Sequence, residues 1–213
     1  RTSSRKSYQL SAAARLGFSV PFSAIGNSPK LIFDFLSFFE EGEFAVKAVG
    51  KSFVRSDNEG KRYTFFTQRL RKDQILENMG RVKNCPLIFQ EYVEKDFELR
   101  ITVVGGKAFA CAIYSQASSR TKTDWRRYDI PNTPHEIFSL PEEVEKKCLA
   151  LVRQLGLEFG CIDMIVTPKG EFVFLEINPV GQWLWIEELT GLPITEAVAQ
   201  LLIRGSGEIG AGG

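Results

Sequence analysis

Two apolar runs separated by a short turn constrain the fold more than any other part of the chain. Residues 160–166 (GCIDMIV) and 174–181 (FLEINPVG) are strand-like, and the turn sequence TPKG lies between them. Each run carries polar residues in apolar surroundings: Asp163 in the first, Glu176 and Asn178 in the second. Because side chains alternate between the two faces of a strand, Glu176 and Asn178 should point to the same side.

The expected hairpin brings Asp163 close to this pair. If the turn has four residues, Val166 pairs with Glu171, and Asp163 lies opposite Phe174. Asp163 is then a diagonal neighbour of Glu176 on the same face, at about 7–8 Å. A one-residue change of register would move Asp163 to the other face, so the expectation depends on this pairing.

Asp163, Glu176 and Asn178 together form a set of hard oxygen ligands. Two carboxylates and a carboxamide suit one or two Mg²⁺ ions. The alternative is that all three are solvated on the outer face of a sheet. Polar oxygens among apolar side chains need partners, and this favours the metal site. The expected same-face neighbours are Cys161, Ile165, Phe172 and Phe174.

The remaining chain alternates between helical and strand-like segments, which predicts an α+β fold. Helices are expected at 6–16, 30–41, 69–83 and 139–155, with two more near the C-terminus. Strands are expected at 19–25, 44–49, 63–67, 87–93, 99–104 and 108–115. Polar loops are expected at 50–62 and 116–135, and a loop as long as the second is usually functional or disordered.

Composition excludes several classes of function. The chain has 213 residues, of which 44% are apolar, and is large enough for one core or two subdomains. Its net charge of +1 argues against nucleic-acid and membrane partners. No apolar run reaches the roughly 18 residues of a membrane span, and no signal-peptide pattern is visible. Four cysteines without CxxC spacing predict reduced, buried thiols in a cytoplasmic protein, and the single histidine, His135, is expected in a surface loop.

Lys47 is a candidate phosphate-binding residue. It lies in the middle of the strand-like run FAVKAV, between Val46 and Ala48. A lysine in a buried strand is costly unless it meets an anion. The alternative is an edge-strand lysine whose ammonium group reaches water.

Two further groups suit a nucleotide. The segment Gln90, Glu91, Tyr92 and Val93 ends a strand and can present backbone groups to a purine edge. Glu98 and Arg100 lie two apart on the next strand and share a face. Glu98 could accept hydrogen bonds from ribose hydroxyls, and Arg100 could stabilise charge on a transferring phosphate or a tetrahedral intermediate. The alternative for this pair is a salt bridge between the two side chains.

An ordered set of motifs resembles the ATP-grasp superfamily over residues 4–204. The set consists of Lys47, QEYV, FELRI, CIDM and FLEINP, in this order along the chain. The chain is more similar still to the ligases that modify ribosomal peptides, of the microviridin or graspetide type. The segments that carry this resemblance are FQEYVEKDFELRITVVGG, SQASSRTKTDWR and LEINPVGQWLW.

The resemblance implies a role for each matching residue. It implies that Lys6 and Lys47 bind ATP phosphates, that the segment from Gln90 through Glu91 and Tyr92 to Val93 forms the adenine hinge, and that Glu98 binds ribose. It places Arg100 over an acyl phosphate and makes Asp163, Glu176 and Asn178 the metal ligands. Asp124 and Arg126 resemble the segment near the acceptor and are expected to contact substrate.

In that family, ATP phosphorylates a side-chain carboxylate of a precursor peptide, and a hydroxyl or amine of the same peptide then closes an ester or amide ring. The resemblance therefore implies an ADP-forming ligase with ATP, Mg²⁺ (or Mn²⁺) and a precursor peptide as partners. The oligomeric state stays open, with a homodimer as one candidate. The resemblance also implies two α/β subdomains that grip ATP between antiparallel sheets, at 1–88 and 89–213.

The chain departs from the family in two places. The phosphate-covering loop at 50–62 contains only Gly50 and Gly60, and the domain that precedes the first ATP lysine is missing. Two alternatives remain open. One is a carboxylate–amine ligase of the glutathione-synthase-like or glutamate-adding type, and the other is a non-catalytic nucleotide-binding module, against which the complete set of residues argues.

Overall fold

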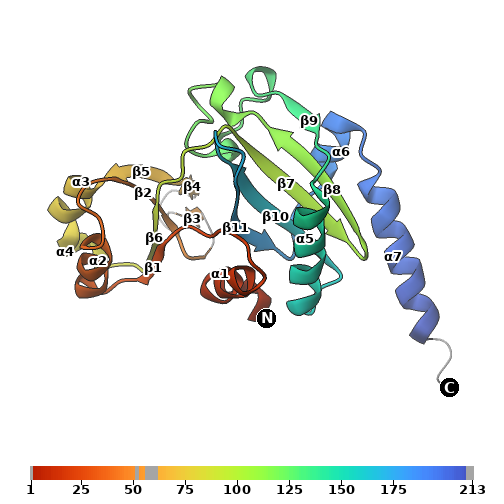
Figure 1. The fold of residues 1–213 in the computed structure, drawn as a ribbon, viewed down its shortest axis with the longest axis horizontal. Coiled ribbons are helices and arrows are strands. Elements are labelled where there is room, and N and C mark those ends of the chain that lie inside the picture. Colours follow the sequence, from red (N-terminus) through yellow and green to blue (C-terminus); the bar gives the residue numbers. More distant parts are fainter. Residues whose placement is uncertain (1, 51–52, 56–61, 210–213) are drawn as a thin grey trace. The chain divides into compact units, whose positions relative to one another are not determined.

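A computed structural model describes residues 2–50, 53–55 and 62–209 (Figure 1). The chain divides into two compact units. The first comprises Arg1–Val20, Lys95–Gln116 and Thr133–Gly213, and the second comprises Pro21–Glu94 and Ala117–Asn132. A single boundary between residues 88 and 89 does not describe this division, because the N-terminal helix packs with the C-terminal part of the chain.

The first unit contains a five-stranded antiparallel sheet in the order β11-β10-β7-β8-β9. Helices α1 and α5 pack on one face of it, where Ala12, Ala13, Cys148 and Leu151 join the apolar side chains of the strands in one core (Figure 1). The opposite face carries Arg100, Asp163, Glu176 and Asn178. The elements are α1 (Lys6–Arg15), β7 (Phe97–Val104), β8 (Lys107–Ile113), β9 (His135–Ile137), α5 (Glu142–Gln154), β10 (Phe159–Val166), β11 (Phe172–Asn178), α6 (Leu184–Thr190) and α7 (Ile194–Ile209).

The β10–β11 hairpin has a different register from the one expected. Val166 pairs with Phe172 rather than Glu171, and Asp163 pairs directly with Glu176 rather than lying opposite Phe174. The register shifts between Asp163 and Met164. The shift leaves Leu175 as the extra residue of a β-bulge, and such a bulge reverses the alternation of side chains along its strand.

The bulge corrects the expected surroundings of the polar residues. Phe174 is fully buried in the core beneath α1 and α5, and Phe172 packs against the same core. Glu176 and Asn178 face the other side, opposite Asp163 and Cys161. The two phenylalanines are therefore not their same-face neighbours, although the strand parity suggested it.

Helix α1 lies along the free edge of β11 through Gln9. The Gln9 side chain donates to the Ile177 carbonyl (2.8 Å) and accepts from the Ile177 N–H (3.3 Å). It also donates to the Ser3 carbonyl at 2.6 Å. The buried amide thus satisfies both backbone groups of Ile177 on this edge, while Ser19 pairs with Val173 farther along it.

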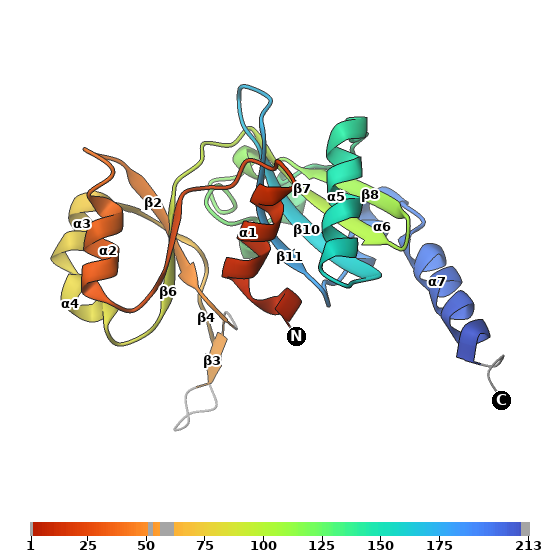
Figure 2. The same cartoon turned by 60° about the horizontal axis from the view of Figure 1, so that its bottom comes forward.

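The second unit contains a four-stranded sheet in the order β1-β6-β2-β5. Helices α2, α3 and α4 cover one face of it, around Ile32, Phe35, Phe44 and Phe89 (Figure 2). The elements are β1 (Ser23–Gly26), α2 (Pro29–Leu36), β2 (Glu43–Ala48), β5 (Gln68–Arg71), α3 (Lys72–Glu77), α4 (Met79–Val82) and β6 (Leu87–Glu91).

Several expected boundaries in this unit were wrong. The expected loop at 50–62 contains β3 (Phe53–Arg55) and the start of β4 (Arg62–Thr64), which pair with each other. Residues 51–52 and 56–61 lie outside the described residues, so the expected phosphate-covering role of this loop, Gly60 included, stays a prediction. The expected helix at 69–83 begins only at Lys72, because its first residues pair with β2 as strand β5.

The expected polar loop at 116–135 is a compact structure of short 3-10 turns. These turns are Ser115–Ala117, Trp125–Arg127 and Ile130–Asn132. Asp129 accepts hydrogen bonds from Ser118 (2.5 Å) and Asn132 (3.0 Å), which tie the loop to itself. His135 lies in strand β9, half-buried against Trp185, and not in a surface loop.

The cysteines are all free thiols, as expected. Cys111, Cys148 and Cys161 are buried, whereas Cys85 is exposed, contrary to the expectation that all four are buried. Burial raises the pKa of Cys148 to about 12 and so keeps it a neutral thiol. None of the helices in the described part of the chain is both long and apolar enough to cross a membrane.

Candidate functional site

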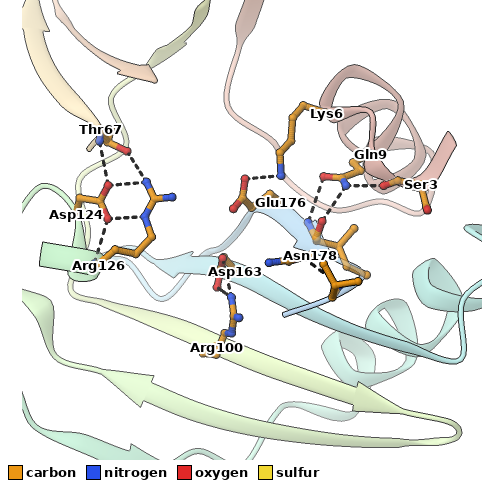
Figure 3. A network of polar contacts seen from close by, with 12 residues as sticks. Ser3, Lys6, Gln9, Thr67, Arg100, Asp124, Arg126, Asp163, Glu176 and Asn178 are labelled. Carbon is orange, nitrogen blue, oxygen red and sulfur yellow. Dashed lines mark hydrogen bonds and ion pairs between the residues drawn. The ribbon is translucent and has the colours of Figure 1, made fainter. Parts of the chain in front are cut away.

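A row of charged side chains crosses three neighbouring strands on the face of the five-stranded sheet that lies opposite α1 and α5. Arg100 of β7 pairs with Asp163 of β10, and Asp163 pairs with Glu176 of β11. Directly opposite residues have Cβ atoms about 4.5–5.5 Å apart. Asp163 and Glu176 are therefore closer than the diagonal neighbours expected from the sequence (Figure 3).

Asp163 is bound to Arg100 by a charge-assisted pair of hydrogen bonds. Arg100 Nη1 donates to both Asp163 carboxylate oxygens, at 2.8 and 3.0 Å. Arg100 is 6% exposed, and this burial disfavours its charged form. The charge and hydrogen bonds of Asp163, together with the electrostatic effects of Cys161 and Glu176, outweigh burial and raise the pKa of Arg100. Arg100 is a permanent cation whose guanidinium plane Asp163 holds in place.

Glu176 and Asn178 have partners close by. Lys6 Nζ, from the first turn of α1, lies 2.6 Å from Glu176 Oε2. Asn178 Oδ1 accepts from the Val180 N–H at 3.1 Å. Gln9 fixes α1 on the edge of β11, so it also sets the position from which Lys6 reaches Glu176 (Figure 3).

The donor set fits Mg²⁺ in chemistry. Two carboxylates and one amide oxygen share one face of the sheet, on paired strands. No cluster of three His, Cys, Asp or Glu side chains suited to a metal occurs in the described ranges. An ion here would thus depend on the Asn178 amide and on ligands outside the protein, such as water and phosphate, as Mg²⁺ sites commonly do.

Gly181 closes the space behind Arg100. A Cβ atom at this position would lie 2.5 Å from both Cβ and Sγ of Cys161, and 2.9 Å from Arg100 Nη2. The φ angle of Gly181 is not positive, so the glycine is required by space and not by backbone conformation. The main chain after Asn178 therefore packs directly on the guanidinium group.

Glu98 and Arg100 each have an ion-pair partner other than the one that the salt-bridge alternative expected. The Glu98 carboxylate instead lies 2.6 Å from Lys95 Nζ, and both side chains are almost fully buried. Arg100 pairs with Asp163, one strand away. Glu98 and Arg100 do share a face of β7, because their partners on β10, Ile165 and Asp163, are two apart.

The second unit holds Lys47 and Gln90 on the face of its sheet that α2, α3 and α4 leave uncovered. Phe44 and Val46 point to the helices, so the alternating residue Lys47 lies on the other face, where it pairs with Ile88. Gln90 pairs with Ala45 on the same face and is 2% exposed. Its Nε2 donates to Ser23 Oγ at 2.8 Å, whereas the buried Oε1 has no partner among the described residues.

The end of β6 offers one backbone donor. The N–H groups of Glu91 and Tyr92 donate to the carbonyls of Phe22 and Glu43. The Glu91 carboxylate accepts from the Phe22 N–H at 2.9 Å and so braces this strand end. In the part of the chain that the structure describes, the Val93 N–H donates to no protein acceptor. Such a donor, three residues after Gln90 with its buried amide oxygen, suits a heteroaromatic ring edge.

Asp124 anchors the compact loop. It is 4% exposed, and its oxygens accept from Thr67 N–H (2.9 Å), Arg126 N–H (3.1 Å) and the Arg126 guanidinium (2.6 and 2.8 Å) (Figure 3). Burial alone would raise the pKa of Asp124, but these hydrogen bonds, chiefly from Arg126, lower it to about 2. The structure shows a positioning role for Asp124; contact of Asp124 or Arg126 with substrate stays a prediction.

Sequence reasoning missed four residues that contact or position the candidate residues within their own units: Gln9, Thr67, Lys95 and Gly181. Gln9 and Thr67 contact residues that are distant in sequence, and Gly181 matters because it lacks a side chain, so no local sequence pattern identifies them. Lys95 is the partial exception. Lys95 comes only three residues before Glu98, so the two side chains are close enough in sequence to meet. Lys95 precedes β7 and Glu98 lies within it, so helical spacing does not explain the contact.

No protein-family model matches the chain, and no curated protein matches it. Solved structures do match. The macrocyclase MdnC of Microcystis aeruginosa MRC, bound with precursor peptide MdnA, is 33% identical with a TM-score of 0.79, and the match covers 95% of this chain and 60% of that chain. A RiPP-associated ATP-grasp ligase of Chryseobacterium gregarium, in complex with ADP and a leader and core peptide, is 33% identical with a TM-score of 0.84, at the same coverages.

A third structure, the D-cycloserine synthetase DcsG, shares the fold at 19% identity, with a TM-score of 0.70 over 96% of this chain and 70% of that chain. The chain spans 60% of the length of the first two structures. The expected α+β fold, with two antiparallel sheets, is confirmed by these matches and by the strand pairing.

Proposed function

Because the chain belongs to the ATP-grasp ligases, we propose that it is an ATP- and Mg²⁺-dependent carboxylate ligase acting through an acyl phosphate. Its substrate is a ribosomal precursor peptide, in which it forms ester or amide crosslinks. The observation that carries the proposal is the row of Arg100, Asp163 and Glu176 on adjacent strands, with Lys6 at its end. The peptide-bound structures at 33% identity support the choice of substrate.

In the proposed reaction, an oxygen of a peptide carboxylate attacks the γ-phosphorus of ATP. The bond to the β–γ bridging oxygen breaks, and ADP leaves with that electron pair. A hydroxyl or amine of the peptide then attacks the acyl carbon, the acyl–phosphate bond breaks, and inorganic phosphate leaves while the nucleophile loses its proton. No protein nucleophile is required.

The chain's own residues supply charge and orientation for these steps. Lys6 and Lys47 neutralise phosphate charge, and Arg100, fixed by Asp163, stabilises the oxyanion that develops at the acyl carbon. The backbone at Val93 and the buried amide of Gln90 bind the adenine edge, and Glu98 accepts from ribose hydroxyls. Asp163, Glu176 and Asn178 would hold Mg²⁺ (one or two ions), which supplies additional neutralisation of the triphosphate.

Four further expectations belong to this proposal. The protein acts in the cytoplasm, where ATP is available and free thiols persist. It works as a homodimer, and Arg126 contacts the peptide. Mn²⁺ replaces Mg²⁺ at the same oxygen ligands.

The test measures ADP release by the full chain with ATP, Mg²⁺ and peptides that contain Glu or Asp together with Ser, Thr or Lys, and detects loss of water from the peptide by mass spectrometry. Glu176→Ala and Asn178→Ala should abolish turnover while the thermal melt keeps its cooperativity. Glu171→Ala, at an exposed carboxylate of the same hairpin, is the matched control.

Near-normal ADP release by either site variant would refute the assigned metal ligands. ADP release with free amino acids or small carboxylates, and none with peptides, would instead identify a carboxylate–amine ligase. Nucleotide binding without any turnover would identify a non-catalytic module.

A further inference from the structure

Lys95 and Glu98 form an ion pair that is buried at the start of β7. Lys95 Nζ lies 2.6 Å from Glu98 Oε1, and the two side chains are 4% and 6% exposed. The Glu98 side chain lies in an apolar row across the sheet, between Ile113 of β8 and Ile165 of β10. Both isoleucines are buried.

A carboxylate among isoleucines is unfavourable without a nearby cation, because burial removes its hydration. The Lys95 ammonium supplies that cation at hydrogen-bonding distance. The backbone that carries Lys95 is itself anchored, since the Asp96 N–H donates to the Val166 carbonyl at 2.8 Å and Phe97 pairs with Val166. The end of β10 therefore fixes the backbone next to Lys95, from which the side chain reaches Glu98.

We propose that Lys95 is a positioning residue for the nucleotide: it keeps the Glu98 carboxylate ionised and oriented to accept the ribose hydroxyls. Lys95 thereby sets the preference for ribonucleotides without touching the nucleotide. This inference rests on the proposed function, in which Glu98 binds ribose. Because the effect passes through Glu98, it must disappear when the ribose hydroxyls are absent.

The test is a comparison of dissociation constants for ATP and 2′,3′-dideoxyATP, measured by isothermal titration calorimetry on the full chain with Mg²⁺. A charged acceptor for hydroxyl groups predicts that the wild type binds ATP on the order of tenfold more tightly than the dideoxy analogue. Lys95→Met should weaken ATP binding by about the same factor and leave dideoxyATP binding nearly unchanged. The ratio of the dissociation constant for dideoxyATP to that for ATP then approaches one.

Three variants serve as references. Glu98→Gln should lower the ratio as Lys95→Met does, and the double variant should lose nothing more, because both act on one interaction. Lys107→Met, at an exposed lysine of β8, should keep the wild-type ratio. If Lys95→Met does not fold, Lys95→Gln, whose amide can still donate to Glu98, replaces it and should show an intermediate ratio.

A Lys95→Met protein that weakens both nucleotides equally overturns the inference, because Lys95 then supports the fold or contacts the phosphates. In that case ATP binding by the wild type still supports the proposed function. A wild type that does not bind ATP, or that binds both nucleotides equally, overturns the assignment of Glu98 to ribose and the inference with it.

Discussion

Replacing Gly181 by alanine should impair catalysis far more than stability. The added Cβ would lie 2.5 Å from Cys161 Sγ and 2.9 Å from Arg100 Nη2. Carbon atoms in contact are normally about 3.5–4.0 Å apart, so the loop or its neighbours must move by roughly 1 Å. Overpacking of this kind costs about 1–3 kcal/mol.

The same displacement acts on the charged row. Arg100 Nη1 holds Asp163 through bonds of 2.8 and 3.0 Å, and these bonds do not survive a large shift of the guanidinium group. A catalytic group misplaced by about 1 Å can cost on the order of 100-fold in rate. We therefore expect the kcat for ADP release to fall about 100-fold, while the melting temperature falls by only several degrees, at roughly 2–4 °C per kcal/mol for a chain of this size.

The assay pairs steady-state ADP release with thermal melts of the same samples. Gly160→Ala is a matched control. Its Cβ would collide with Ile177 Cδ1 at 2.7 Å on the helix-covered face, away from Arg100. It should lose comparable stability and keep most of its activity. Cys161→Gly, combined with Gly181→Ala, removes the Cβ and Sγ atoms that collide and should restore part of kcat.

Gly181→Ala with kcat within about twofold of the wild type would refute this reasoning, because it would show that the loop accommodates a methyl group without moving Arg100. A loss of activity that merely follows the unfolded fraction would refute it as well, since the effect would then be structural.

Three further predictions concern single residues of the two units. Gln9→Leu leaves the Ile177 N–H and carbonyl without the Gln9 amide, so the free energy of unfolding in urea should fall by about 1–3 kcal/mol; an unchanged midpoint would contradict the edge-capping role. The pKa of Asp124 is lowered from 3.8 to about 2, so its ionised form stabilises the fold by about 2 kcal/mol near neutrality, and this is lost as the pH falls from about 4 toward 2. Asp124→Asn should flatten the pH dependence of the melting temperature over that range, and an unaltered slope would exclude Asp124 as its source. Lys47→Met should weaken ATP binding about tenfold or more in calorimetry, whereas the exposed Lys30→Met should not; equal affinities would exclude Lys47 from the phosphate site.

Local sequence patterns were sufficient for much of the sheet that carries the site. The strands around Arg100 and Asp163 were expected at 99–104 and 160–166, and they occur at Phe97–Val104 and Phe159–Val166. Alternation also predicted correctly that Glu176 and Asn178 share a face. These properties depend on neighbours two residues apart, which a sequence displays directly.

Contacts over long sequence separations could not be predicted in this way. Gln9 is 168 residues from Ile177, and Thr67 is 57 residues from Asp124. Nothing near Gln9 distinguishes it from an ordinary polar residue of an amphipathic helix. The first 20 residues belong to the unit that contains β11, and a division by sequence position alone misses this.

The bulge at Leu175 explains why a wrong register still placed the acidic residues together. Without it, strand parity would put Phe174 and Glu176 on one face, and either the phenylalanine would leave the core or the carboxylate would enter it. The extra residue lets Phe174 pack under the helices while Glu176 turns to meet Asp163 directly. The single extra residue, Leu175, therefore allows an apolar core on one face of the strand and a charged row on the other. For this reason the polar pair of the FLEINP run faces away from the phenylalanines that precede it.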